Sequence, residues 1–153
     1  MFRLILPVII FAGGPLSAQS LKICPTNNVQ PCDQILACIG TDGQWFSGVA
    51  LGFGPLNSVV GTLENGNVCT GQRMRYNKAL TGQITLECAD GSLGTVVYEN
   101  HAPHQTYGTG QAQLDGGRAI EVWVAQDVKT ALRVVSGDDE DRLLCPDGAI
   151  RLD

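Results

Sequence analysis

The stretch Asn67–Cys88 reads NVCTGQRMRYNKALTGQITLEC and decides the fold class. In its last six residues apolar and polar side chains alternate, so that Ile84, Leu86 and the final cysteine share one face. A period of two residues is typical of a strand with one buried face. The stretch therefore predicts two consecutive antiparallel strands, Asn67–Tyr76 and Gln83–Cys88, with a short connection between them.

The two cysteines of this stretch, Cys69 and Cys88, are predicted to form a disulfide with each other. Their pairing centres the hairpin between Lys78 and Ala79, inside the polar residues 77–81. Directly opposed residues at a non-hydrogen-bonded site have Cα atoms about 4.5 Å apart, at the short end of what a disulfide allows. The same register places two further pairs opposite each other: Gly71 with Leu86, and Arg73 with Ile84.

All six cysteines follow residue 18: Cys24, Cys32, Cys38, Cys69, Cys88 and Cys145. An even number in an oxidising compartment is typical of a disulfide framework, for which six cysteines allow 15 pairings. No two have the C-x-x-C spacing of a redox site or a zinc ribbon. We expect three bridges, with Cys145 bonded to the N-terminal segment.

Turn dipeptides divide the rest of the chain in the same way as this hairpin. They are Asp42-Gly43, Asn65-Gly66, Asp90-Gly91, Asp115-Gly116 and Asp147-Gly148. Such pairs tolerate the positive φ of tight hairpin turns. Besides the two strands above, they predict Gln44–Phe53, Ser58–Leu63, Gly94–Glu99, Thr106–Leu114, Arg118–Ala125 and the shorter Leu132–Ser136 and Arg142–Cys145.

Small residues occupy one face of the predicted strand Gln44–Phe53. Gly48, Ala50 and Gly52 alternate with the larger Val49 and Leu51. Glycine weakens a strand unless curvature or a close backbone approach requires it. The fold class predicted is therefore all-β: a disulfide-stapled antiparallel meander that curls into a small barrel or β-roll of about seven to nine strands.

Two segments are ambiguous. In residues 128–135 the apolar positions fit a helical stripe that Asp127 could cap, and they also fit a strand, which we favour. Lys22–Gly40 shows no clear period and suggests at most a helical turn at Asp33–Ala37. The expected organisation is a signal peptide (1–18), a cysteine-rich segment (19–40) and one glycine-rich β domain (41–153).

Residues 1–18 have the order of a secretory signal: Arg3, an apolar run, and small residues that end at Ala18. Without them 135 residues remain, with nine basic and 15 acidic side chains and a net charge of −6. Such a charge disfavours nucleic acid and anionic membranes as partners, and no stable membrane insertion is expected after removal of the signal. Arg73 and Arg75 share one strand face and are expected at a solvated edge.

No motif specifies a reaction. His101 and His104 could bind a metal ion, but a zinc site usually needs three or four ligands, so we expect an ordinary loop and neither metal nor cofactor. The acidic run Asp138–Asp141 lacks the spacing of a calcium loop. Ser92 does not stand in a Gly-x-Ser-x-Gly motif. Trp123 is either a weak binding anchor or, as we favour, covered by a neighbouring loop.

The function expected is that of an exported, non-catalytic β-module that binds another protein or a component of the cell envelope. One alternative is an inhibitor of an extracellular hydrolase, for which His101–Gln105 would be the inhibitory loop. The other is an unrecognised hydrolase. A pocket that holds a histidine with a perturbed pKa would favour the hydrolase, whereas a barrel filled with side chains would count against it.

Overall fold

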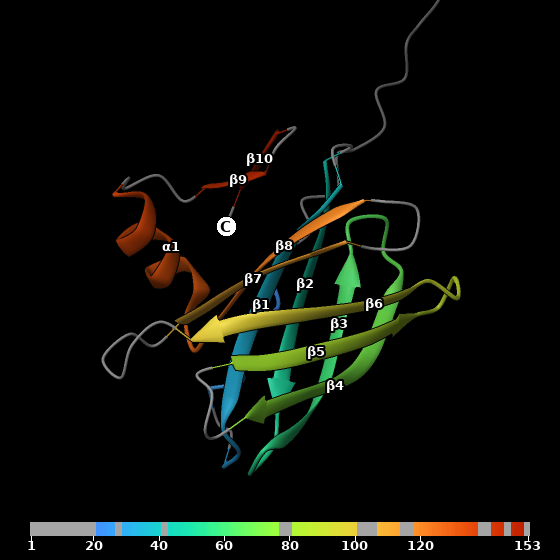
Figure 1. The fold of residues 1–153 in the computed structure, drawn as a ribbon. Helices are drawn as coiled ribbons and strands as arrows, with labels where there is room; N and C mark the ends of the chain where they lie inside the picture. Colours follow the sequence, from blue (N-terminus) through green and yellow to red (C-terminus); the bar gives the residue numbers. More distant parts are fainter. Residues whose placement is uncertain are drawn as a thin grey trace, which may run out of the picture.

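The computed structural model describes residues 21–26, 29–40, 43–76, 81–100, 107–113, 118–137, 142–145 and 148–151. Its elements form a closed barrel, a helix and a small hairpin (Figure 1). The barrel strands are β1 (Cys32–Ile39), β2 (Gln44–Leu51), β3 (Leu56–Leu63), β4 (Val68–Tyr76), β5 (Thr81–Cys88), β6 (Leu93–Asn100), β7 (Tyr107–Gln113) and β8 (Ala119–Ala125). The helix α1 (Val128–Ser136) follows, and then β9 (Arg142–Cys145) and β10 (Gly148–Arg151).

The barrel is an antiparallel meander in which each strand pairs with the next one along the chain. It closes where β1 pairs with β8, with Ile35 opposite Val124 and Ile39 opposite Ile120. Closure satisfies the backbone groups that an open sheet leaves unpaired at its two edges. The predicted all-β, disulfide-stapled fold is confirmed.

The predicted central hairpin has the predicted register. Cys69 lies opposite Cys88, Gly71 opposite Leu86 and Arg73 opposite Ile84. The two cysteines are bonded, with their Cα atoms 3.9 Å apart. The other bonds join Cys24 to Cys32 and Cys38 to Cys145, so the cysteine near the C-terminus is tied to the N-terminal segment as expected.

Of the five predicted turn dipeptides, Asn65-Gly66 and Asp90-Gly91 are described in full and Asp42-Gly43 at its glycine, and these three glycines have a positive φ. The angles are 73° at Gly43, 86° at Gly66 and 81° at Gly91. L-residues with side chains rarely adopt this conformation, which explains why glycine follows Asp or Asn there. Residues 115, 116 and 147 lie outside the described residues, and Gly148 is the first residue of β10.

Aromatic side chains fill the barrel interior by lying over glycines of their own or the neighbouring strand. A Cβ atom at Gly48 would come within 2.5 Å of Phe46 Cζ, and one at Gly61 within 2.5 Å of Phe46 Cε2. A Cβ at Gly82 would overlap Cζ and the hydroxyl oxygen of Tyr98. The row of small residues seen in the sequence is therefore on the inner face, where it makes room for these rings.

Gly82→Ala is expected to lower the free energy of unfolding by about 1–3 kcal/mol, the usual cost of overpacking a filled core. In a Tyr98→Leu background the same substitution should cost clearly less, because the clashing atoms belong to the Tyr98 side chain. Denaturant unfolding of the four proteins of this double-mutant cycle measures the coupling. Thr85→Ala, an exposed position on the same strand, is the control; equal costs of Gly82→Ala in both backgrounds would contradict the packing described.

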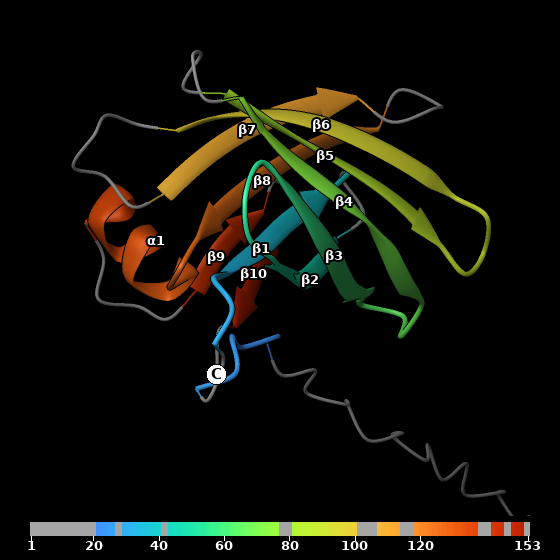
Figure 2. The same cartoon turned by 90° about the horizontal axis from the view of Figure 1, so that it is seen from below.

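A second apolar cluster lies outside the barrel, between α1 and the outer faces of β1 and β8 (Figure 2). Its buried members are Leu36, Cys38, Trp123, Ala125, Val128, Ala131, Leu132 and Cys145. The side chain of Asp127 caps the helix by accepting from the Thr130 N–H at 3.2 Å, and Gly137 ends it with φ 67°. The Cys38–Cys145 bond fastens β9 to the same face.

Two sequence predictions are corrected here. The helical turn at Asp33–Ala37 is wrong, because Cys32–Ile39 is a barrel strand with both faces covered, one by the barrel interior and one by α1. The strand Leu132–Ser136 is also wrong, because Val128–Ser136 is a helix. The helical spacing of the apolar residues is therefore the correct interpretation of this segment, because the helix covers the outer face of the barrel with its apolar side.

Candidate functional site

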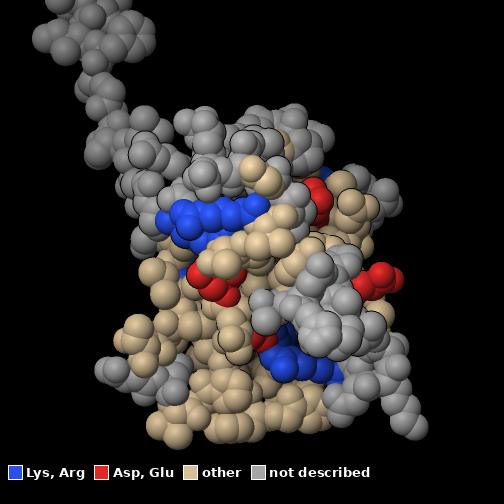
Figure 3. Space-filling view, turned by 90° about the vertical axis from the view of Figure 1, so that its left-hand side faces the viewer, with Lys and Arg blue, Asp and Glu red and all other residues tan. Residues whose placement is uncertain are grey.

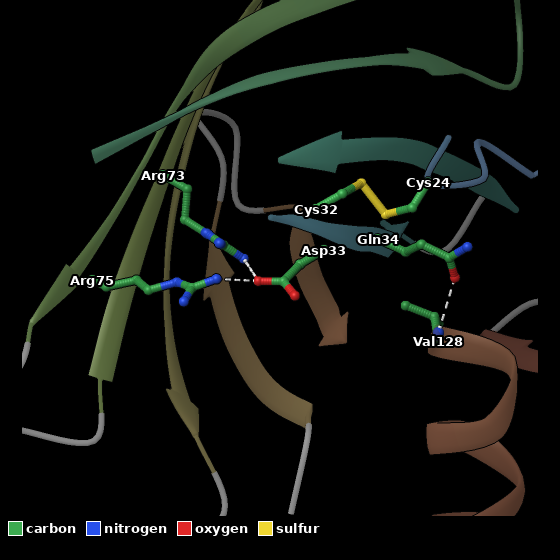
Figure 4. Close-up of a disulfide and its surroundings, with 7 residues drawn as sticks. All are labelled: Cys24, Cys32, Asp33, Gln34, Arg73, Arg75 and Val128. Atoms are coloured by element: carbon green, nitrogen blue, oxygen red, sulfur yellow. Dashed lines mark hydrogen bonds and ion pairs between the residues drawn. A yellow bond between two sulfur atoms is a disulfide. The ribbon is translucent and has the colours of Figure 1, made fainter. Parts of the chain in front are cut away.

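Four polar side chains meet inside the barrel, near the end at which β4 terminates. We call Asp33, Asn57, Arg73 and Arg75 the interior polar cluster. Arg73 donates from Nη1 to Asp33 Oδ2 at 2.6 Å and from Nη2 to Asn57 Oδ1 at 2.8 Å. Arg75 donates from Nη2 to the same oxygen of Asp33 (Figure 4). One carboxylate oxygen therefore joins two guanidinium groups.

Burial differs sharply between the two arginines. The side chain of Arg73 is 2% exposed and that of Asp33 16%, whereas Arg75 is 42% exposed. The predicted solvated edge is thus wrong for Arg73, whose strand face is the inside of the barrel. Burying a charge is costly unless it is paired and hydrogen-bonded, and Asp33 and Asn57 supply those partners. Within the described residues Arg73 Nε has none.

The start of β1 positions Asp33 through contacts on both of its neighbours. Cys32 is held by the Cys24–Cys32 disulfide, and Gln34 accepts a hydrogen bond from the Val128 N–H of α1 at 2.9 Å (Figure 4). Because successive side chains of a strand point to opposite faces, fixing Gln34 outward directs Asp33 inward. The side chain of Asp33 thus points across the barrel interior toward β4, which is not a neighbour of β1 in the sheet.

Tyr98 adjoins this cluster. Arg75 lies opposite Gly82, and Gly82 lies opposite Tyr98, whose hydroxyl lies over that glycine. Burial raises the pKa of the Tyr98 hydroxyl above its ordinary value, and the positive charges of Arg73 and Arg75 lower it by less. Tyr98 therefore stays a neutral hydrogen-bonding group next to two cations.

The raised pKa of Tyr98 predicts a loss of stability in alkali. The folded protein holds this proton more firmly than the unfolded chain, so stability is complete below the unfolded-state pKa of about 10 and falls as the pH rises above it. A single titrating proton gives a slope of at most about 1.4 kcal/mol per pH unit. Denaturant unfolding between pH 8 and 11 should show stability falling with pH in the wild type, and falling less steeply in Tyr98→Phe; parallel curves would contradict it.

The candidates of the sequence analysis that lie among the described residues do not assemble into a reaction centre. His101, His104 and the acidic run 138–141 lie outside the described residues. Ser92 lies in a turn, where its hydroxyl donates to Asp90 Oδ1 at 2.6 Å. Trp123 is 7% exposed beneath α1, so it is covered, as the sequence analysis favours. The described part of the chain holds no group of three side chains suited to a metal ion.

Hollows also lie away from the interior polar cluster. One, of about 170 Å³, opens at the opposite barrel end, where apolar Ile39 and Leu63 lie beside polar Asp90 and Ser92. A second, of about 570 Å³, lies against the ends of β7 and β8, with Glu121 as the one ionisable side chain among its described lining. A third, of about 300 Å³, lies beside Leu63. In the first hollow the Ser92 hydroxyl donates to Asp90, and because this bond lowers the pKa of the Asp90 carboxyl, that carboxylate is a weak base.

The outer faces of β3 to β6 form a wall with few charges, which we call the outer wall. Register places its side chains in rows across the four strands. The rows are Leu56, Met74, Gln83 and Val97; Ser58, Gln72, Thr85 and Thr95; and Val60, Thr70, Glu87 and Leu93. Leu56, Met74, Val97, Val60 and Leu93 are among the exposed large apolar side chains of the protein.

Among solved structures, this chain is similar to designed β-barrels. No family model matches the chain, and no curated protein matches it. A structure of a redesigned β-barrel, mFAP1, bound to DFHBI is 17% identical, with a TM-score of 0.46 over 61% of this chain and 91% of that one. A second structure, of a de novo designed fluorescence-activating β-barrel, is 12% identical, with a TM-score of 0.47 over 63% of this chain and 91% of that one.

Among the described residues, no helix is both long enough and apolar enough to cross a bilayer.

Proposed function

We propose that this protein is an exported, non-catalytic β-module that binds another macromolecule or a component of the cell envelope. The observation that carries the proposal is the outer wall. Its three rows contain five exposed apolar side chains among Ser, Thr and Gln, with Glu87 as the one ionised group. Leu56 and Met74 are neighbours in the first of these rows, and exposed apolar side chains with a polar surround are typical of an interaction site.

The residue composition of the outer wall favours another protein as the partner. Nucleic acids and anionic membranes require a basic surface, and the three rows contain no Lys or Arg. Met74 and Leu56 lie opposite each other, and Val97 lies in the same row, on the far side of Gln83. This row contains no charged side chain, and the centre of a protein–protein interface is typically depleted of charged residues.

The filled barrel supports binding at the surface over chemistry in a cavity. Phe46, Tyr98 and the buried Arg73 occupy the interior, and small-molecule pockets are usually larger than about 300 Å³ and concave. The hollow of about 170 Å³ at the barrel end is smaller than that, and the hollow of about 570 Å³ has Glu121 as the one ionisable side chain of its described lining. These features weigh against the hydrolase alternative.

The inhibitor alternative depends on His101–Gln105, which lie outside the described residues. Export is supported by the three disulfides, since such bonds form and persist in oxidising compartments. An inhibitor would present its loop to an active-site cleft, whereas the proposed module would use the outer wall. Substitutions in the two places therefore separate the two functions.

The test is capture of partners from periplasmic or secreted extract by immobilised protein. We expect a partner that the wild type retains and Met74→Lys with Val97→Lys loses, because two charges would be buried without counter-ions in the interface. The control is Val134→Lys, which changes a more exposed apolar residue on α1. Retention by the wall variant, or equal loss in the control, would contradict the outer wall as the interface; hydrolytic activity that depends on His101 or His104 would favour the alternatives.

A further inference from the structure

We propose that the interior polar cluster binds a carboxylate group of a ligand beside Arg75, at the barrel end where β4 terminates. This site is separate from the outer wall and does not depend on the function proposed above. Three observations carry it: the charge balance of the cluster, the rigid placement of its members and the open side of the Arg75 guanidinium.

The cluster has more positive than negative charge. Arg73 and Arg75 both bond to one oxygen of Asp33, and within the described residues no other carboxylate is paired with either of them. The cluster therefore carries one excess positive charge, in a chain whose net charge is −5. Two guanidinium groups held this close repel each other, and a bound anion would offset that repulsion.

A structural role alone accounts for only one of the two arginines. Arg73 is buried, and its bonds to Asp33 and Asn57 join β4 to β1 across the barrel and to the neighbouring β3. That link would be complete without Arg75, which is exposed. Arg75 adds the second charge at the point where the cluster reaches solvent.

The cluster is preorganised for a ligand. Asn57 is 2% exposed and fixes one side of Arg73, while the Cys24–Cys32 bond and Gln34 fix the strand that carries Asp33. Asp33 in turn holds Arg75, so this flexible side chain loses less freedom when it binds. The hydroxyl of Tyr98 lies over Gly82, directly across from Arg75, and supplies a neutral donor.

The open side of the site is visible in the figures. In the close-up, one terminal nitrogen of Arg75 contacts Asp33 and the other points away from it (Figure 4). Figure 3 views the molecule from the side on which β4 and β6 end, and it shows two separate groups of basic side chains there. Because the Arg75 side chain is 42% exposed, an anion can reach its other terminal nitrogen without displacing Asp33.

A carboxylate fits this site better than a multiply charged oxyanion. Its single negative charge equals the excess charge of the cluster, and its planar pair of oxygens matches the planar donors of a guanidinium. A more highly charged anion would be opposed by the acidic chain around it. The group can come from a small organic acid or from the C-terminus of a partner chain, which share this chemistry.

The test is an NMR titration of the folded protein with acetate, read on the arginine Nε–Hε signals. In the wild type we expect saturable shifts of the Arg75 and Arg73 signals and none at Arg118, which donates to Gln44 at 3.3 Å near the opposite end. Arg75→Gln should weaken acetate binding, read at Arg73, by about tenfold or more. The matched control Arg118→Gln should leave it unchanged.

Two further measurements identify the source of the carboxylate group and test whether the site prefers a singly charged anion. A short peptide with a free C-terminus that binds more tightly than acetate, and loses this advantage when amidated, would indicate the C-terminus of a partner; equal affinities would indicate a small acid. Linear, parallel shifts at Arg75 and Arg118, or unchanged binding in Arg75→Gln, would overturn the proposal. Tighter binding of sulfate or phosphate than of acetate would overturn the assignment to a carboxylate.

Discussion

Arg73→Ala should lower the free energy of unfolding by about 3–5 kcal/mol, the usual cost of breaking a buried ion pair by removing one partner. Arg73 is 2% exposed and bonds to Asp33 and Asn57, so its removal leaves the buried Asn57 amide without this donor and the largely buried Asp33 carboxylate with Arg75 alone. It also leaves a void in a filled interior. For a protein of ordinary stability, about 5–15 kcal/mol, this is a large fraction of the total.

The matched control is Arg75→Ala, two residues along the same face. Because Arg75 is 42% exposed, solvent screens its bond to Asp33, and we expect a cost of about 1 kcal/mol or less. Denaturant unfolding of both variants, with the slope of the transition monitored, measures the difference. Equal costs for the two substitutions would show that burial of Arg73 does not govern the energetics of the cluster.

Removal of the Cys38–Cys145 bond should have the second large effect. The bond closes a loop with a sequence separation of 107, and loop-closure entropy predicts a cost of about 4.7 kcal/mol for a loop of this length. The same relation predicts about 3.2 kcal/mol for Cys69–Cys88, with a separation of 19, and about 2.5 kcal/mol for Cys24–Cys32, with a separation of 8. The loss should also loosen β9, which this bond fastens to the outer face of β1.

Three double alanine variants, one for each bond, test this order by thermal and denaturant unfolding. Hydrogen exchange in the Cys38→Ala, Cys145→Ala variant should show faster exchange in α1 and β9 than in β4 and β5, since α1 belongs to the apolar cluster that contains this bond. The reverse order of stabilities, or uniform exchange across the barrel, would indicate that contacts in the native state outweigh the entropy of the unfolded chain.

Local patterns were sufficient for the hairpins. The register of β4 and β5 and the Cys69–Cys88 bond were predicted because alternation, a short polar connection and two cysteines all agree within 22 residues. The turns at Gly43, Gly66 and Gly91 were predicted because a positive φ restricts the residue type. In both cases the determining contacts are close in sequence.

The alternation of apolar and polar residues does not predict a strand whose two faces are both covered. Ile35 faces the barrel interior and Leu36 faces α1, so β1 reads as a continuous apolar run without a period of two. The reverse problem affects Val128–Ser136, whose few apolar positions fit a helix or a strand. The barrel decides between them, because β1 and β8 offer an outer apolar face that a helical stripe covers.

The sequence by itself determined the antiparallel β class, the central hairpin, its disulfide and the curvature made possible by glycine. Only the tertiary structure decided which face of β4 is internal and hence that Arg73 is buried. Its partner Asp33 lies 40 residues earlier, and Asn57 lies 16 residues earlier, on strands that closure of the barrel brings within reach. No local pattern encodes such a meeting, because it depends on strand order and shear around the whole barrel.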